Sequence, residues 1–188
     1  GCERCHGPGE HHVNLHEQGL ESEPIDRTIV NPEHVPANQK IDICLQCHLQ
    51  GTMRVLKKDH TETDFRPGQS LTALKSIFIQ AGLPPGDFGI ASHGERFLSS
   101  VCYQKSRMGC TYCHDPHRPV QTVSRSFFNG RCTTCHETLS PATQTGHHRP
   151  GADCVACHMR QGATADILHV NFTDHWIRKK FWNAPKAS

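Results

Sequence analysis

The chain has 188 residues, of which 35% are hydrophobic, and its formal net charge is +2 at neutral pH. A near-neutral charge without a run of like sign argues against nucleic-acid binding, and no stretch approaches the roughly 18 apolar residues of a membrane span. A chain this polar has little material for an apolar core, so we expect another component to fill its centre.

The chain begins with a Cys-x-x-Cys-His motif at residues 2–6, followed by a Gly-Pro-Gly turn. Four further copies of the motif follow, and the last three copies begin 22 residues apart, at positions 110, 132 and 154. This regular spacing indicates a compact repeat in the C-terminal half. The four later copies occupy residues 44–48, 110–114, 132–136 and 154–158.

The long interval between the second and third motifs holds most of the other predicted elements. Apolar residues at helical spacing predict a helix over residues 71–81. A capping box that starts at Ser92 predicts a second helix, which ends before Gly109. Near the C-terminus, residues 167–172 are the best candidate for a short strand, and a third helix is predicted to start after Thr173.

Cys-x-x-Cys-His is the attachment motif of c-type haem. Each thiol adds across one of the two haem vinyl groups, and the adjoining histidine binds the iron from the proximal side. The sequence therefore predicts five covalently attached haem c groups. The attaching cysteines are Cys2, Cys5, Cys44, Cys47, Cys110, Cys113, Cys132, Cys135, Cys154 and Cys157, and the proximal ligands are His6, His48, His114, His136 and His158.

Zinc and a redox dithiol are the alternatives. Cys110, Cys113, Cys132 and Cys135 fit the spacing of a zinc ribbon. However, five pairs cannot all combine into four-cysteine sites, and every pair is followed by histidine. A thioredoxin-like dithiol would occur once, near a βαβ pattern. The eleventh cysteine, Cys102, is either a buried free thiol in a helix or a residue for redox chemistry or an intermolecular disulfide.

The chain has enough histidine for a second histidine on every iron. Sixteen histidines less five proximal ones leave eleven, whereas there are only three methionines. We therefore expect low-potential bis-histidine haems. His16, His34 and His60 are weak candidates. The stronger distal candidates are His12, with His11 as its adjacent rival, His93, His117, His147 or His148, His169 and His175.

These features predict a mainly α fold with extensive loops and very little β structure. Short helices and coil would wrap around a stack of covalently bound haems, in one pentahaem cytochrome c domain that spans residues 1–188. With one haem to about 38 residues (188 divided by five), the macrocycles have to lie close together.

Several stretches resemble the doubled-CXXCH, cytochrome-c554-like multihaem family of bacteria. They cover nearly the whole chain and read "CHGPGEHHV", "CLQCHLQGTMRV", "DFRPG", "ASHGERFLSSVC", "CTYCHDPHRP" and "CVACHMRQGATADILHVNFTDHWIRKK". Two features depart from the family: the chain starts where many members carry further motifs upstream, and its last motif continues His-Met-Arg instead of His-Met-Pro. The resemblance implies electron transfer, with His12, His93, His117, His169 and His175 as ligands.

We therefore expect an electron carrier, not an enzyme, in the periplasm or outside the cell, because haem c is attached outside the cytoplasmic membrane. Its partners would be redox proteins or extracellular electron acceptors. Self-association into a conductive filament, with haem contact or a shared distal histidine between subunits, is a further expectation. The alternative is a multihaem oxidoreductase for nitrogen or sulfur oxides, which requires one haem with an open distal position.

Overall fold

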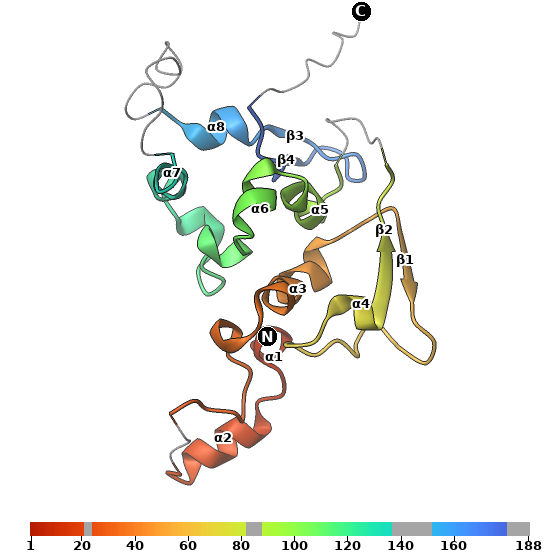
Figure 1. Ribbon diagram of the computed structural model, residues 1–188, viewed down its shortest axis with the longest axis vertical. Coiled ribbons are helices and arrows are strands. Elements are labelled where there is room, and N and C mark those ends of the chain that lie inside the picture. Colours follow the sequence, from red (N-terminus) through yellow and green to blue (C-terminus); the bar gives the residue numbers. More distant parts are fainter. Residues whose placement is uncertain (21–23, 82–87, 137–151, 180–188) are drawn as a thin grey trace, which may run out of the picture. The chain divides into compact units, whose positions relative to one another are not determined.

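The computed structural model describes residues 1–20, 24–81, 88–136 and 152–179 (Figure 1). The chain divides into two compact units, which we call unit 1 (Gly1–Ala81) and unit 2 (Gly82–Ser188). Helices take up 41% and strands 9% of the described residues, which confirms a mainly helical fold with little sheet. None of the helices in these ranges is long and apolar enough to cross a membrane.

Unit 1 is organised around α3, its longest helix. Ile41 and Leu45 lie one turn apart on α3, and both are buried. The backbone N–H of Leu71 donates to the carboxylate of Asp42 over 2.9 Å, which fixes α4 against α3. The elements are α1 (Glu3–His6), α2 (Glu10–Glu17), the 3-10 turn η1 (Pro32–His34), α3 (Ala37–His48), β1 (Met53–Leu56), α4 (Leu71–Leu74) and β2 (Lys75–Phe78).

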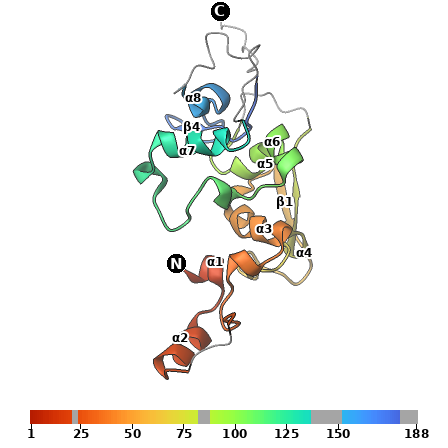
Figure 2. The same ribbon diagram turned by 60° about the vertical axis from the view of Figure 1, so that its left-hand side comes forward.

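Unit 2 consists of short helices and a two-stranded antiparallel sheet, in which Gly162 pairs with Phe172. Figure 2 shows α5 and α6 as two consecutive short helices. The elements are α5 (His93–Leu98), α6 (Val101–Ser106), η2 (Cys110–Tyr112), η3 (Val120–Thr122), α7 (Arg125–Thr133), α8 (Cys154–His158), β3 (Gln161–Ala163) and β4 (Asn171–Thr173).

The predicted helix over residues 71–81 is wrong beyond its first turn. It ends at Leu74, and the chain continues as β2, which pairs antiparallel with β1 from Met53↔Phe78 to Leu56↔Lys75. The helical spacing of the apolar residues could not reveal this outcome, because the partner strand lies about 20 positions earlier in the chain and supplies the hydrogen bonds.

The predicted helix after Ser92 is divided in two. Ser92 is the N-cap residue of α5, as predicted, but its side chain makes no capping bond; its hydroxyl donates to the carbonyl of Gly89 over 2.7 Å. The Ser100 side chain accepts from the N–H of Tyr103 and so starts a second helix, α6, which ends before Gly109 as predicted. The predicted start of the helix is therefore right, whereas its continuity is wrong.

The C-terminal prediction is partly right. The strand covers 171–173, within and just beyond the predicted 167–172, but residues 174–179 are not helical. The N–H of Trp176 donates to the carboxylate of Asp174 over 2.9 Å. This local bond between a side chain and the backbone competes with helix formation, as aspartate commonly does.

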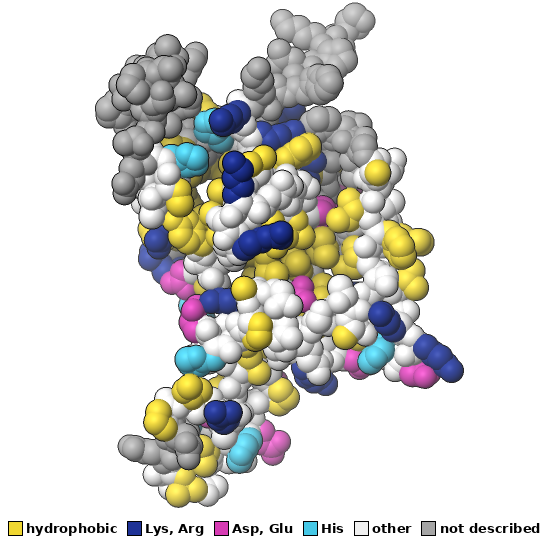
Figure 3. Space-filling view, viewed as in Figure 1, with side chains coloured by type: hydrophobic (Ala, Val, Ile, Leu, Met, Phe, Trp, Pro, Cys, Tyr) yellow, Lys and Arg dark blue, Asp and Glu magenta, His cyan; other side chains and the backbone are white. Residues whose placement is uncertain are grey.

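Unit 2 buries very little apolar surface of its own. Among the described residues, the buried hydrophobic side chains of unit 1 number six, whereas Phe88 is the single one in unit 2. Large apolar side chains such as Val101 and Leu168 are exposed, and Figure 3 shows hydrophobic side chains at the surface. The described residues of unit 2 thus do not form a conventional core by themselves.

Gly51, which precedes β1, gives a test of the β1–β2 pairing. It has a φ of +63°, and an added Cβ would lie 2.5 Å from Ile77 Cγ2 and 2.9 Å from the carbonyl oxygen of Phe78. Gly51→Ala should lower the free energy of unfolding by more than the ~1–2 kcal/mol of the left-handed backbone alone, measured by urea denaturation.

The matched control is Gly19→Ala. Gly19 has a similar φ of +66°, but no atom lies within 4 Å of its added Cβ. Equal losses of stability in the two variants would mean that the close approach of β2 to Gly51 does not constrain the fold.

Candidate functional site

All five Cys-x-x-Cys-His motifs lie on a helical turn. They occupy α1, the end of α3, η2, the end of α7 and α8. In α1, for example, the N–H of His6 donates to the carbonyl of Cys2 over 3.0 Å. Positions i, i+3 and i+4 of a helix share one face. Each motif therefore presents two thiols and one imidazole on the same side, as two bonds to one macrocycle and an axial bond to its iron require.

The motifs of each unit lie close together. In unit 1, the pKa of Cys5 is raised by burial and by the nearby Cys44 and Cys47 of the second motif. In unit 2, burial and then Cys154, Cys113 and Cys102 raise the pKa of Cys132 to about 11. A nearby thiolate raises the pKa of a second thiol because the two negative charges would repel each other, and this effect requires a short distance. The third, fourth and fifth motifs are therefore near neighbours.

In the described part of the chain, several histidines use Nδ1 for a hydrogen bond to a protein oxygen, and four of them bear on the haem sites. His6 donates to the carbonyl of Val30 over 2.8 Å, and His158 donates to the carbonyl of Arg178 over 2.7 Å. The other two are predicted distal ligands, His12 and His175. A neutral imidazole that donates through Nδ1 keeps its lone pair on Nε2, which is the arrangement of most metal-binding histidines.

The two adjacent N-terminal histidines, His11 and His12, have different surroundings. His12 is partly buried and donates through Nδ1 to Asp26 over 2.8 Å, whereas His11 is exposed. His16 lies one turn further along α2 and donates through Nε2 to the same carboxylate oxygen over 3.1 Å. Hydrogen bonds from Thr28, and then from the two histidines, hold the pKa of Asp26 well below its usual range. His12 therefore keeps its Nε2 for a ligand, and His16 does not.

In unit 2, His93, His114 and His175 converge from three segments of the chain. His93 is the first residue of α5, His114 follows η2, and His175 follows β4. The ring of His93 contacts that of His175, with centres 4.6 Å apart. Burial, and then the neighbouring imidazoles of His93 and His114, lower the pKa of His175 to about 4. His175 is therefore neutral at pH 7, as a metal-binding imidazole has to be.

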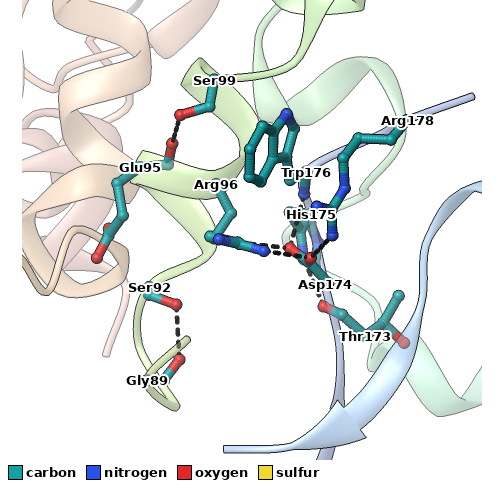
Figure 4. Close-up of polar contacts among 10 residues, drawn as sticks. All are labelled: Gly89, Ser92, Glu95, Arg96, Ser99, Thr173, Asp174, His175, Trp176 and Arg178. Carbon is teal, nitrogen blue, oxygen red and sulfur yellow. Dashed lines mark hydrogen bonds and ion pairs between the residues drawn. The ribbon is translucent and has the colours of Figure 1, made fainter. Parts of the chain in front are cut away.

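A buried ion network flanks His175 (Figure 4). Asp174 is 1% exposed, and its carboxylate accepts two bonds from Arg96, from Nε over 2.8 Å and from Nη2 over 2.5 Å. Arg178 donates to the same carboxylate over 2.9 Å. The guanidinium groups of Arg96 and Arg178 lie 4.8 and 4.2 Å from the ring centre of Trp176. The network fixes the segment that carries His175 against α5, which carries His93.

The remaining predicted histidines are less constrained. His117 has an exposed side chain, and its Nδ1 lies 3.6 Å from Asp115, beyond hydrogen-bond distance. His169 is exposed in a left-handed backbone conformation, with a φ of 64°. The proximal candidates His48 and His136 are also exposed. His147 and His148 lie outside the described residues.

The positions of the cysteines bear on the two alternatives to haem, a zinc site and a redox dithiol. None of the eleven cysteines is in a disulfide. Within the described ranges, the residues that bring three metal-binding atoms together are His12, His16 and Asp26, and no set of cysteines does so. The four cysteines that fit the spacing of a zinc ribbon are thus not arranged around a common point. Cys102 lies on α6, partly buried, and its pKa is raised by burial and by Cys135.

Sequence reasoning missed the residues that hold the histidines. Asp26, Asp174 and Arg96 carry no motif, and their roles depend on contacts such as that between Arg96 and Asp174, 78 positions apart. The carbonyl acceptors of His6 and His158 are backbone atoms, which any residue provides. The spacing of His12 and His16 was the one signal in the sequence for a shared partner, since i and i+4 lie on one helix face.

No protein-family model matches this chain, and no curated protein or solved structure matches it either. The motifs and their geometry therefore carry the functional argument.

Asp174→Asn tests the ion network. The substitution removes the charge between two buried guanidinium groups, and we expect a loss of about 3–5 kcal/mol in the free energy of unfolding, measured in urea. Glu33→Gln is the matched control, because Glu33 makes an ion pair with Lys40 at 2.7 Å while its own side chain is 72% exposed. Its loss should stay below about 1 kcal/mol. A small loss for Asp174→Asn would contradict a structural role for the network.

Proposed function

We propose that this protein is a pentahaem c-type cytochrome that transfers electrons between closely packed haems. The observation that carries the proposal is the placement of all five Cys-x-x-Cys-His motifs on helical turns, with the motifs of each unit close together. This arrangement suits one covalent haem for each motif and short distances between neighbouring haems.

The shortage of apolar core in unit 2 supports the same proposal. A unit that carries three motifs but buries one apolar side chain among its described residues needs another source of burial. Three macrocycles with a large apolar face would provide it. Covalent attachment then retains the haems where burial by protein alone would not.

The chain's own residues have three tasks in electron transfer. The cysteines hold each macrocycle by two thioether bonds. The histidines bind through Nε2, because Nδ1 of His6, His12, His158 and His175 is occupied by a protein oxygen. The ion network of Asp174 orders the region around His175. Bound haem iron supplies the one-electron chemistry.

A carrier function, not catalysis, follows from the supply of distal histidines. In His12 and in His175, Nδ1 donates a hydrogen bond to a protein oxygen, which leaves Nε2 available for iron. His93 lies beside His175. An iron with two imidazole ligands has no open position for a substrate. We place the protein in the periplasm or outside the cell, with redox proteins or external acceptors as its partners, because c-type haem is attached there.

The number of haems on the chain can be tested by intact-mass spectrometry of protein produced with a c-type maturation system. The parent should carry five haems. Cys154→Ala combined with Cys157→Ala should carry four, since that motif loses both attachment sites. Cys102→Ser, which changes a cysteine outside every motif, should retain five. Loss of a haem from Cys102→Ser would contradict the assignment of attachment sites.

Cyanide binding separates a carrier from an enzyme. With two histidines on every iron, the oxidised protein should show low-spin absorption that does not change when cyanide is added. A high-spin band that cyanide removes would reveal an open iron and would favour the oxidoreductase alternative.

Assembly into a filament stays a prediction from the sequence. Electron microscopy of the purified holoprotein should show long, regular fibres if haems of successive subunits continue the chain of electron transfer. Small uniform particles at every protein concentration would contradict it.

A further inference from the structure

The convergence of three histidines in unit 2 contains information on which histidines share an iron. The ring centres of His114 and His175 are 6.0 Å apart, and the rings are inclined by 30°. His93 lies nearer to His175, with centres 4.6 Å apart and an angle of 71°. The ring-centre distance decides whether an iron fits between two imidazoles, and it differs between these two pairs.

The expected separation follows from elementary geometry. Imidazole nitrogen binds metals at about 2 Å, so two imidazoles on opposite sides of one iron have ring centres about 6 Å apart. The pair His114 and His175 has this separation. The pair His93 and His175 is too close to hold an iron between its rings, and its steep angle is that of an edge-to-face contact.

We propose that His175 is the distal ligand of the iron whose proximal ligand is His114, in the third motif. The inference rests on the proposed function, because it presupposes a haem on Cys110 and Cys113. It goes beyond that function by pairing two particular histidines, 61 positions apart in the chain. His93 would then serve a different iron.

The surroundings of His175 hold it for this role. Its Nδ1 donates to the carbonyl of Thr173 over 2.9 Å, which leaves Nε2 for the iron. The backbone N–H of the preceding residue, Asp174, donates to the carbonyl of Arg160 over 2.7 Å, and the carboxylate of Asp174 accepts from two arginines. The backbone that leads into His175 is therefore fixed before any metal binds.

His117 is the distal candidate nearest to His114 in the sequence, but it is expected to serve a different iron. Three residues are a short reach around one macrocycle, and its side chain is 75% exposed. The ring of His114 instead has Phe128 and His175 as neighbours, with centres 5.6 and 6.0 Å away. His175 thus lies beside the ring of His114.

The first test is the holoprotein variant His175→Ala, examined by intact mass and by electron paramagnetic resonance. The mass should still show five haems, while one haem changes from low spin to high spin and becomes able to bind cyanide. His34→Ala is the matched control, because the sequence makes His34 a weak ligand candidate and its side chain is exposed. It should leave all haems low spin. A wholly low-spin His175→Ala protein would overturn the pairing.

A second pair of variants identifies the iron. In a protein that lacks the third haem through Cys110→Ala and Cys113→Ala, adding His175→Ala should create no high-spin haem, because the partner iron is already gone. In a protein that lacks the fifth haem through Cys154→Ala and Cys157→Ala, adding His175→Ala should still create one. The reverse pattern would assign His175 to the fifth motif and overturn the pairing.

A conservative variant covers the case in which His175→Ala does not fold. His175→Met keeps a side chain that fills the site and can bind iron, so one haem should stay low spin with a raised reduction potential. Unchanged potentials for all five haems would count against the pairing. A parent protein without covalent haem would overturn the proposed function itself, which the mass measurement shows independently of the spin states.

Discussion

The buried carboxylate of Asp174 is the contact on which the described part of unit 2 depends. It accepts hydrogen bonds from Arg96 on α5, from Arg178 and from the backbone of Trp176. The carbonyl of Arg178 in turn accepts from His158 at the end of α8. One aspartate thus joins α5, the C-terminal segment and the fifth motif. Such a network adds less to net stability than its bonds suggest, but it specifies one arrangement of the segments it joins.

This constraint matters because the unit has little apolar core to position its elements. Helices as short as α5, α6 and α8 are not stable in isolation and need tertiary contacts to persist. In our account, the ion network and the covalently attached haems provide those contacts. The same interactions that order the chain then also set the histidine positions, so folding and metal binding are coupled.

The sequence predicted the features that depend on local spacing. The three-residue interval between the cysteines places them on one helical turn in every motif, and the mainly helical character was confirmed. It failed at residues 75–78, which became a strand because the distant segment β1 pairs with them. It also failed at residues 174–179, where a local bond from the N–H of Trp176 to the carboxylate of Asp174 competes with a helix. No local pattern in the sequence indicates which oxygen accepts a hydrogen bond from each histidine Nδ1. The same holds for the short distance between His114 and His175.

The central claim is that each of the five motifs holds one covalently bound haem. The most direct measurement is a haem count per chain from the alkaline pyridine spectrum, taken after acidic acetone has removed any haem that is not covalently attached. Our account predicts five haems per chain in the extracted protein, with the spectrum of haem bound through two thioether bonds. Loss of the haem into the acetone, or a chain that carries zinc in place of haem, would contradict it.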